Sequence, residues 1–555
     1  MRNGGQLLVD CLMALGAEKG FGVPGESYLA VLDALHDCRG KLDFVMCRNE
    51  GGAAFMAAAW GKLTGAPGIC FVTRGPGATN ASIGIHTAMQ DSAPMIVFVG
   101  QVGTDMKGRE AFQEIDYRAV FGSMAKWAVE IDDVTRLPEI VGRAWKTALA
   151  GRPGPVVVAL PEDMLSARTD TKPLSGPAEI FEPAPAPEAM TRLTHLLETA
   201  QRPLMLIGGC NWSESGRESL QAFAETSEVP VLAAFRYQDR FDNFSPVFCG
   251  EAGVGMPAHA RRLLTQADLI IAVNVRFGEM TTDGYTLLEV PEPKQKLVHV
   301  HASDGEIGKI YRPTLGMQAG PNAFAAALRP VSGGWQAWCE EGRAEFEASF
   351  DAPSQPSPVD MVAVMADLRA RLPEDAILTN GAGNFTVWPN KFFRFGPKAR
   401  LLAPQSGAMG YGLPAAIAAK VAYPERCVVC FAGDGDFQMN CQELATAAQA
   451  GAQPIVLVLN NGIYGTIRAH QERNFPARVS GTTMSGNPDF AALARSYGFH
   501  GERVETTGDF AAAFERALSS GTGAVLDLAI SAEALTPRVT LSQMREQALA
   551  RSKAG

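Results

Sequence analysis

Short apolar runs alternate with alanine-rich stretches along most of the chain. Runs such as "GICFV" at 68–72, "PMIVFVG" at 94–100 and "CVVCFAG" at 427–433 each lead into a glycine-containing turn or a stretch of helix-forming residues. Continuous apolar runs of this length predict strands that are buried on both faces, and helices between them predict parallel pairing. The pattern therefore predicts an α/β fold built from doubly wound parallel sheets.

Two stretches rich in proline and polar residues predict linkers, at 169–188 and 341–358. They divide the chain into an N-terminal domain at 1–168, a central α/β domain at 189–340 and a C-terminal domain at 359–535, followed by a tail at 536–555 that reads as a surface helix or a frayed end. The first and third domains share a plan of strand, glycine-rich turn and alanine-rich helix. Two such domains facing each other would form a cleft.

Composition narrows the class of protein. The 555 residues carry a formal charge of −10 without a run of lysine and arginine, which argues against a nucleic-acid partner. No apolar run is long enough to span a membrane, and charged residues interrupt the first 22 residues, so we expect a cytoplasmic protein. The ten cysteines are scattered, and the single CxxC, Cys427 and Cys430, falls where a strand would place the two on opposite faces. Reduced thiols are favoured over a zinc or redox site.

Two aspartates stand between glycines where the run at 427–433 ends. Asp434 and Asp436, flanked by Gly433 and Gly435, would place a carboxylate and free backbone N–H groups at the carboxyl end of a parallel sheet, where such folds bind ligands. Asn461 ends the next apolar run. With a carbonyl near Ile463 and two phosphate oxygens, these groups would complete a Mg²⁺ site. For the Gly-Asp-Gly segment alone, a plain turn is the stronger alternative; together with Asn461 at this spacing, a metal site is favoured.

The segment "GDGDFQMNCQELATAAQAGAQPIVLVLNNGIYG" at 433–465 resembles the diphosphate-binding motif of thiamine diphosphate (ThDP)-dependent enzymes, in the acetolactate synthase-like branch of large catalytic subunits. Further similar segments, in the same order along the chain, are "FGVPGE", "RNEGGAAFMAAAWGKLTG", "TRGPGATN", "GRPGPVVVALPED" and "QSGAMGYGLPAAIAAK". The resemblance covers essentially the whole chain. It implies a pyrimidine-binding, a central and a diphosphate-binding domain, with ThDP and Mg²⁺ as cofactors.

The resemblance also implies roles for individual residues. Asp434, Asn461 and the Ile463 carbonyl would bind the metal, and the backbone at Gly433, Gly435 and Asp436 would hold the diphosphate. The other implied cofactor contacts are Pro24, the carbonyl of Gly407, which would meet the aminopyrimidine, and Met409, which would hold the cofactor bent from below.

The proton relay implied by the resemblance is Glu50, which would hydrogen-bond the aminopyrimidine ring and promote its imino tautomer, so that the thiazolium carbon loses its proton. Phe112 and Gln113 would line the reaction centre. Because Glu50 and Met409 belong to different domains, the resemblance implies that two subunits share each site, with a homodimer as the minimal active unit and a homotetramer as the expected assembly.

Substrate recognition departs from the family pattern. Thr466, Arg468 and His470 occupy the segment in which acetolactate synthases carry a tryptophan that favours 2-oxobutyrate. Arg468 could pair with a carboxylate and His470 could shuttle a proton, but both fit a helix surface equally well. Val23 and His86 are further candidates, and for His86 a core histidine is the stronger alternative.

The resemblance implies FAD as a possible second cofactor, because acetolactate synthases bind FAD in their central domain. The segments "LIGGC" and "NVRFGE" fit that motif in part, and the motif's second arginine is missing. An empty structural domain fits these residues as well.

The sequence thus predicts ThDP- and Mg²⁺-dependent decarboxylation of a 2-oxo acid, pyruvate first, with transfer of the acyl carbanion to a second carbonyl. The alternative is a decarboxylase, carboligase or lyase acting on another 2-oxo acid or 2-hydroxy ketone. A flavin or nicotinamide oxidoreductase is disfavoured because no GxGxxG with a following acidic residue opens a βαβ unit. A non-catalytic homologue is disfavoured because Glu50, Met409, Asp434 and Asn461 are all present.

Overall fold

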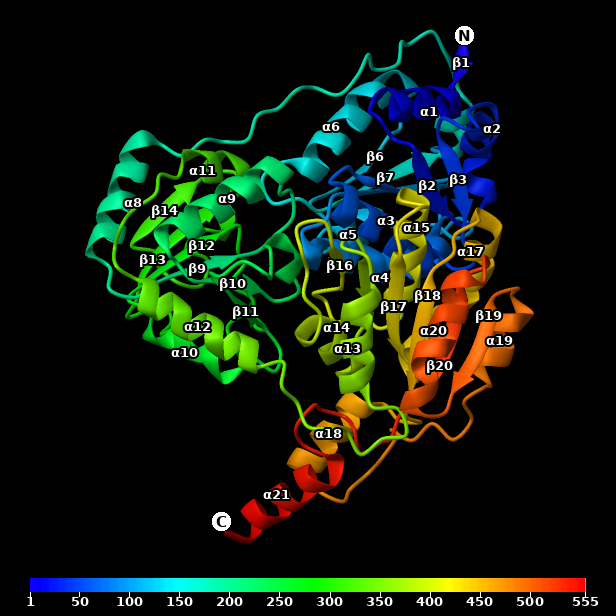
Figure 1. Cartoon of the computed structure of the whole chain (residues 1–555). Coiled ribbons are helices and arrows are strands. Elements are labelled where there is room, and N and C mark those ends of the chain that lie inside the picture. The colour runs from blue at the N-terminus through cyan, green and yellow to red at the C-terminus, as the bar shows by residue number, and fades with distance from the viewer. Residues whose placement is uncertain (555) are drawn as a thin grey trace.

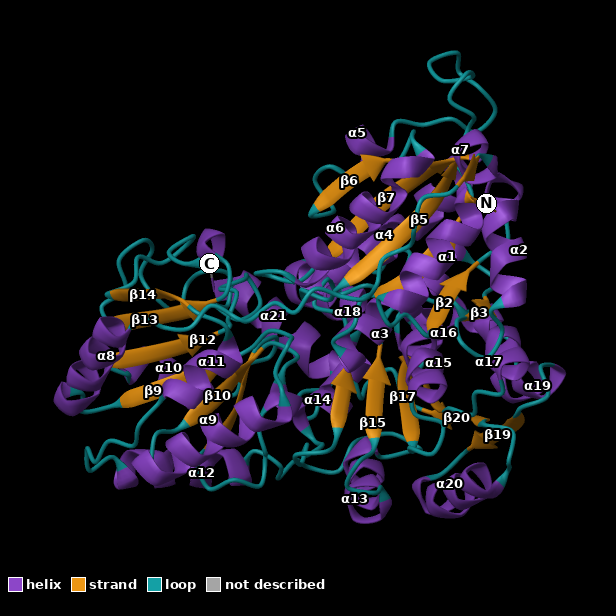
Figure 2. Cartoon of the chain, turned by 90° about the horizontal axis from the view of Figure 1, so that it is seen from above, coloured by secondary structure: helices purple, strands orange, loops and turns teal. Residues whose placement is uncertain are grey.

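The computed structural model describes residues 1–554 and contains three six-stranded parallel sheets, one in each predicted domain. Figure 1 shows the N-terminal domain in blue, the central domain in green and the C-terminal domain in yellow to red. Viewed from above, the three sheets lie around a common middle (Figure 2). The prediction of three doubly wound α/β domains is confirmed.

The N-terminal and C-terminal sheets have the same strand order. The first runs β3-β2-β4-β5-β7-β6 and the third β16-β15-β17-β18-β20-β19, so each reads 2-1-3-4-6-5 when its strands are numbered in sequence. The strands are β2 Lys19–Gly22, β3 Asp43–Met46, β4 Gly68–Val72, β5 Met95–Gln101, β6 Trp127–Glu130, β7 Pro155–Pro161, β15 Ile377–Asn380, β16 Arg400–Leu402, β17 Val428–Gly433, β18 Ile455–Asn460, β19 His500–Val504 and β20 Ala524–Ala529. The shared plan seen in the sequence is therefore a shared topology.

The central sheet has a different order, β11-β10-β9-β12-β13-β14, which is the order of dinucleotide-binding sheets. Its strands are β9 Pro203–Ile207, β10 Val231–Ala234, β11 Phe248–Ala252, β12 Leu269–Val273, β13 Lys296–His301 and β14 Leu315–Gln318. Outside the three sheets, β1 Arg2–Asn3 pairs antiparallel with β8 Arg168–Thr169 and closes the N-terminal domain.

Helices cover both faces of each sheet (Figure 2). The N-terminal domain carries α1 Gly4–Ala14, α2 Leu29–Asp37, α3 Glu50–Thr64, α4 Gly75–Asp91, α5 Tyr117–Phe121, α6 Leu137–Leu149 and α7 Glu162–Ser166. The central domain carries α8 Pro187–Thr199, α9 Glu214–Ser227, α10 Ala258–Gln266, α11 Pro321–Ala327 and α12 Gln336–Ala348. The C-terminal domain carries α13 Met361–Arg371, α14 Val387–Lys391, α15 Gly412–Ala422, α16 Asp434–Gln438, α17 Leu444–Ala450, α18 Gly465–Asn474, α19 Phe490–Ser496, α20 Phe510–Ser519 and α21 Leu541–Ala554.

The first and third domains share one hydrophobic core. Helices α3 and α15, both rich in alanine, pack against each other, and the rings of Phe55 and Tyr411 meet edge to face at 5.4 Å. Small side chains let the two helices approach closely, so burial of apolar surface on both sides stabilises the pairing. This packing fixes the N-terminal residue of α3, Glu50, relative to the C-terminal domain.

The connections differ in detail from the sequence prediction. The segment between α7 and α8 runs across the top of Figure 1, and its residues 170–186 lie outside any helix or strand. Helix α12, however, continues to Ala348, so the extended part of the predicted linker at 341–358 is shorter than proposed. The tail forms α21, which packs on α18 through buried Leu541 and Met544.

All ten cysteines are free. Among residues 1–554, no helix is both long enough and apolar enough to cross a bilayer.

Candidate active site

A cavity of about 210 Å³ lies at the carboxyl ends of β15 and β17, the two strands at which the order of the C-terminal sheet reverses. Doubly wound sheets bind ligands at this switch point. The lining includes residues 382–385 after β15, residues 433–436 after β17 and Asn461 after β18. Strands β17 and β18 are direct neighbours, with Gly433 paired to Leu459, so Asp434 and Asn461 are brought to the same edge as predicted.

Asp434 is a buried carboxylate held by hydrogen bonds. Its Oδ2 accepts from the N–H of Gly462 at 2.8 Å and from Nδ2 of Asn487 at 2.7 Å, and its Oδ1 accepts from the N–H of Gly435 at 3.1 Å. Only 2% of Asp434 is exposed, and burial raises the pKa of its carboxyl. A buried anion with neutral partners is a good ligand for a cation, because a bound cation would offset the cost of desolvating the charge.

The neighbouring Asp436 organises backbone rather than facing a ligand. Its Oδ1 accepts from the N–H of Ala382 at 3.0 Å and of Gly410 at 2.9 Å, and burial raises its pKa to about 7. A side chain at Gly381 would overlap this carboxylate. Asp436 therefore ties the loop after β15 to the turn that carries Met409.

The donor set at this edge fits a magnesium ion bound together with a phosphate. Among residues 1–554 there is no group of three or more His, Cys, Asp and Glu side chains that could hold a metal alone. Asp434, the Asn461 amide and the backbone near Ile463 supply fewer oxygens than an octahedral Mg²⁺ needs, so ligand phosphate and water would supply the rest. The Thr466 hydroxyl beside them is buried and has no hydrogen-bond partner in the described chain.

Gly407 and Met409 lie on the loop that follows β16, and both line the cavity. Gly407 has φ +66°, a conformation that side chains disfavour, and a side chain on it would meet no atom within 4 Å. Its backbone is therefore open to a ligand. Met409 is half-buried beside it.

Glu50 begins α3 in the N-terminal domain, and its carboxylate accepts a hydrogen bond from Nδ2 of Asn80 at 3.0 Å. Glu443 of the C-terminal domain, which the sequence interpretation missed, accepts from the backbone N–H of Arg48 at 3.2 Å and of Asn49 at 2.9 Å. Glu443 is fully buried, and burial raises its pKa. This carboxylate therefore fixes the start of α3 and with it the position of Glu50.

The other predicted residues of the N-terminal domain lie at the same edge of its sheet. Val23 and Pro24 follow β2, and the carbonyl of Val23 accepts from the Tyr28 hydroxyl. Phe112 is 69% exposed, and Gln113 has φ +64° with its carbonyl accepting from the N–H of Gly75 at 3.0 Å. Pro24 and Phe112 are exposed, whereas Val23 and Gln113 are half-buried.

The predicted residues thus form two separate half-sites within one chain. In the part of the chain that is described, the cavity at β15 and β17 is lined by residues 382–534 alone, and Glu50, Phe112, Gln113, Val23 and Pro24 are not among them.

A larger cleft of about 1270 Å³ opens from the same place and runs between the central and C-terminal domains. Thr466 and Gly407 line both cavities, and His86 and His470 line the cleft. Arg468 lines neither cavity: its guanidinium donates to the hydroxyls of Thr482 at 2.8 Å and Thr483 at 2.7 Å.

Family models match all three domains. The thiamine pyrophosphate enzyme N-terminal TPP binding domain matches residues 2–120, the central domain 190–328 and the C-terminal TPP binding domain 381–528. The chain belongs to the thiamine pyrophosphate enzyme family.

Relatives within this family are similar over nearly the whole chain. The acetolactate synthase isozyme 2 large subunit of Escherichia coli (strain K12) is 32% identical over 521 residues, covering 93% of this chain and 94% of the relative. The acetolactate synthase large subunit of Parasynechococcus marenigrum (strain WH8102) is 34% identical over 517 residues, covering 90% and 83%. The corresponding subunit of Corynebacterium glutamicum is 31% identical, covering 93% and 84%.

Membership in the thiamine pyrophosphate family agrees with the shape of the cavity. The cavity offers a buried carboxylate, an amide and glycine-lined backbone, and these groups fit a diphosphate with its cation. In the crevice of the central sheet, at the carboxyl ends of β9 and β12, only about 10 Å³ remains free, which is too small for FAD to enter the crevice itself.

Two residues of the site were not predicted, Asn487 and Glu443. Asn487 lies in a segment without a local motif, and Glu443 lies within the segment 433–465 at a position to which the resemblance gave no role; their partners are 53 and 394 residues away in sequence. The one available signal for Glu443 is a charged residue within the alanine-rich stretch that follows the two aspartates.

Proposed function

We propose that this protein is a ThDP- and Mg²⁺-dependent acetolactate synthase-like transferase that decarboxylates pyruvate and joins the acyl carbanion to a second carbonyl. The observation that carries the proposal is the buried Asp434 carboxylate with Asn461 at the switch point of a sheet in this family. The relatives that are similar over the whole chain are acetolactate synthases, which supports the reaction class.

When bound, ThDP supplies a nucleophilic carbon that adds to the carbonyl of a 2-oxo acid and takes up electrons as CO₂ leaves. In this proposal Asp434, Asn461 and the Ile463 backbone hold Mg²⁺, and the backbone at Gly433, Gly435 and Asp436 holds the diphosphate. Met409 supports the cofactor from below and Gly407 offers its carbonyl to the aminopyrimidine. Pro24 would add an apolar contact to the cofactor.

Glu50 would hold and exchange a proton at its carboxylate with the aminopyrimidine, the step that produces the reactive carbon. Phe112 would exclude water from the reaction centre and Gln113 would donate to a substrate oxygen. Thr466, His470, His86 and Val23 would contact the substrate. For Arg468, the hydrogen bonds to Thr482 and Thr483 favour a structural role over contact with the substrate.

A homodimer is the smallest unit that would complete the site, because the two half-sites are separate within one chain. The N-terminal half-site of one subunit would cover the C-terminal half-site of the other, and a homotetramer would be a pair of such dimers. We keep the domain limits 1–168, 189–340 and 359–535 in this proposal. We also place the protein in the cytoplasm, since its ten cysteines are free.

A second function is a ThDP-dependent lyase or carboligase for a larger substrate. The cleft of about 1270 Å³ favours it, and apolar side chains such as Met280 and Val254 line that cleft. An apolar side chain there would suit a substrate part without a carboxylate.

The deciding experiment is a product assay with ThDP, Mg²⁺ and pyruvate that follows CO₂ and acetolactate together. Equal molar release of both products supports the synthase. CO₂ with free acetaldehyde, or turnover of another 2-oxo acid while pyruvate is inert, would favour the second function. Absence of ThDP binding would overturn both.

A further inference from the structure

The central sheet has its own switch point, between β9 and β12, and protein side chains fill it. The crevice lies beside Gly209 and Cys210 after β9 and Asn274 after β12, where a dinucleotide-type sheet binds its ligand. Only about 10 Å³ is left there. This volume holds about one water molecule, so no part of a nucleotide fits inside the crevice itself, although Arg276, Thr281 and Gln405 of its lining also face the large cleft.

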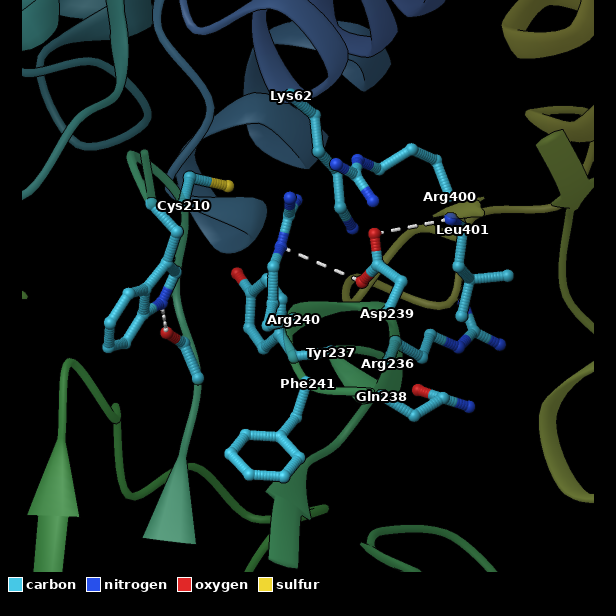
Figure 3. A network of polar contacts seen from close by, with 12 residues as sticks. Lys62, Cys210, Arg236, Tyr237, Gln238, Asp239, Arg240, Phe241, Arg400 and Leu401 are labelled. Atoms are coloured by element: carbon cyan, nitrogen blue, oxygen red, sulfur yellow. Dashed lines mark hydrogen bonds and ion pairs between the residues drawn. The ribbon is translucent and has the colours of Figure 1, made fainter. Parts of the chain in front are cut away.

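Tyr237 lines this crevice together with Asn274, whose Nδ2 donates to the carbonyl of Cys210 at 2.8 Å. Tyr237 is 4% exposed, and its hydroxyl donates to the backbone carbonyl of Asp91 at 2.7 Å. The Lys62 ammonium lies 5.2 Å from the centre of the ring, within the range of a cation–π contact. Figure 3 shows Lys62 entering from the N-terminal domain and Tyr237 standing on the segment that follows β10, with Cys210 nearby.

The cations around the crevice are already paired within the protein. Arg152 donates to Glu306 and to the Ser92 hydroxyl, both at 3.0 Å. Arg276 donates to the backbone carbonyl of Gln90. A nucleotide phosphate would have to displace these partners as well as the tyrosine ring.

The same cluster reaches the loop that carries Gly407 and Met409. Lys62 Nζ donates to Asp91 Oδ2 at 3.0 Å and to the carbonyl of Ala403 at 2.7 Å, and Asp91 Oδ1 accepts from the N–H of Gln405 at 2.6 Å. The ion pair between Lys62 and Asp91 is buried, with side chains 0% and 2% exposed. The Lys62–Asp91 pair of the N-terminal domain therefore contacts Tyr237 of the central domain and binds residues 403–405 of the C-terminal domain.

Neighbouring contacts hold the same loop and the strand before it. The Ser406 and Thr87 hydroxyls lie 2.9 Å apart, and Arg236 donates to the carbonyl of Pro404. Asp239 Oδ2 accepts from the N–H of Leu401 in β16 at 3.2 Å, the bond drawn as a dashed line in Figure 3. The segment of the central domain that follows β10 thus binds both β16 and the loop after it.

We propose that Lys62, Asp91 and Tyr237 form a positioning cluster for the thiamine site, and that Tyr237 occupies the central crevice in place of a flavin. The cluster acts through the loop at 403–409 and does not touch the reacting atoms. A buried ion pair contributes little net stability, and in this proposal the role of the Lys62–Asp91 pair is to hold the loop with Gly407 and Met409 in one arrangement. The inference rests on the proposed ThDP function.

The first test is a calorimetric titration of ThDP at fixed Mg²⁺ into Lys62→Met, with Lys19→Met as the matched control. Lys19 pairs with Asp43 at 2.6 Å in the same domain, away from the loop. We expect the ThDP Kd of Lys62→Met to rise about 10- to 100-fold, the usual cost of losing an outer-shell partner, and that of Lys19→Met to stay near the wild-type value. An unchanged Kd in folded Lys62→Met would overturn the proposal.

Loss of Lys62 leaves Asp91 buried without its partner, so folding is checked by circular dichroism before titration. If Lys62→Met does not fold, the double variant Tyr237→Phe with Thr87→Val decides, because it removes two hydroxyls and no charge. A weaker ThDP Kd at wild-type circular dichroism supports positioning. A lower melting temperature with an unchanged Kd shows a purely structural role and contradicts it.

The second test measures visible flavin absorbance of the wild-type protein, as purified and after incubation with excess FAD followed by gel filtration. We expect no flavin band. A band corresponding to one flavin per chain would overturn the assignment of Tyr237. A wild-type protein that binds neither FAD nor ThDP would instead overturn the proposed function, so the two failures are distinguishable.

Discussion

The Glu443 carboxylate accepts a 2.9 Å hydrogen bond from the backbone N–H of Asn49, the residue directly before Glu50. Glu443 lies in the C-terminal domain and Glu50 in the N-terminal domain, so one domain sets the position of the residue that we propose as the proton relay. Thr446 donates to the second oxygen of Glu443 at 2.6 Å, which leaves the carboxylate fully engaged. The two half-sites of one chain are therefore connected, although they do not share a cavity.

Replacing Glu443 tests this connection. Glu443→Gln keeps the shape but has one acceptor oxygen for three donors, so the start of α3 should shift. We expect turnover to fall about 10-fold, at the scale of a lost charge-assisted hydrogen bond. Steady-state kinetics at saturating ThDP measures it, with the exposed Glu425→Gln as control. Equal turnover in both variants would contradict the role given to Glu443.

Glu50→Gln tests the proton relay itself. The amide cannot exchange the proton, so we expect ThDP and Mg²⁺ to bind while turnover falls by about two orders of magnitude or more. Parallel ThDP titration and product assay separate binding from chemistry. A variant that retains full turnover would exclude Glu50 as the relay.

Asp434→Asn tests the metal site. Burial raises the pKa of this carboxyl, so the amide removes a costly buried charge, but it also leaves one acceptor oxygen for the three donors Gly462, Gly435 and Asn487, and these two effects on stability oppose each other. We expect the Mg²⁺-dependent increase in melting temperature with ThDP to disappear, whatever the melting temperature of the variant without cofactor. Thermal unfolding with and without both cofactors gives the answer, and a retained Mg²⁺ effect would place the metal elsewhere.

His470 and Arg468 lie on the same helix, α18, and we expect their substitution by alanine to have different effects. His470 is exposed and lines the large cleft, whereas Arg468 is bound to Thr482 and Thr483. We expect His470→Ala to change the KM or the acceptor preference without loss of stability, and Arg468→Ala to lower the melting temperature. Competition between pyruvate and 2-oxobutyrate measures preference. The reverse pattern would assign substrate contact to Arg468.

His301, buried at the end of β13, should make the protein sensitive to acid. Burial lowers its pKa from the usual 6.5 to about 4, and its Nδ1 accepts from the N–H of Ser303 at 3.0 Å. Between these pH values the unfolded chain binds the proton and the folded chain does not. The contribution of neutral His301 to the free energy of unfolding is therefore fully present above pH 6.5 and is lost as the pH falls toward 4. The loss reaches about 3 kcal/mol, at about 1.4 kcal/mol per pKa unit.

The measurement compares wild type with His301→Asn, which keeps an acceptor for Ser303 and cannot be protonated. Denaturant unfolding across this pH range should show a smaller loss for the variant. Parallel pH profiles for the two proteins would assign the acid sensitivity to other groups.

The sequence by itself determined the local parts of this protein. Apolar runs followed by glycines specified the parallel strands, since burial on both faces demands apolar residues at every position. The spacing of Asp434 and Asn461 put both at one sheet edge, because the two runs became the adjacent strands β17 and β18. Family motifs in the right order then indicated ThDP, and the family models agree.

Only the tertiary structure decided which distant groups meet. Glu443 reaches the start of α3, Lys62 reaches the loop before Met409, and Tyr237 reaches the carbonyl of Asp91 beside a crevice that the strand order alone would assign to a nucleotide. No periodicity records these contacts, because each joins residues more than a hundred positions apart and depends on how whole domains pack. The separation of Glu50 from the cavity is likewise a property of three-dimensional packing. The local sequence pattern determines where a strand runs and at which edge of the sheet it ends. Packing between domains determines which side chains come together in one site.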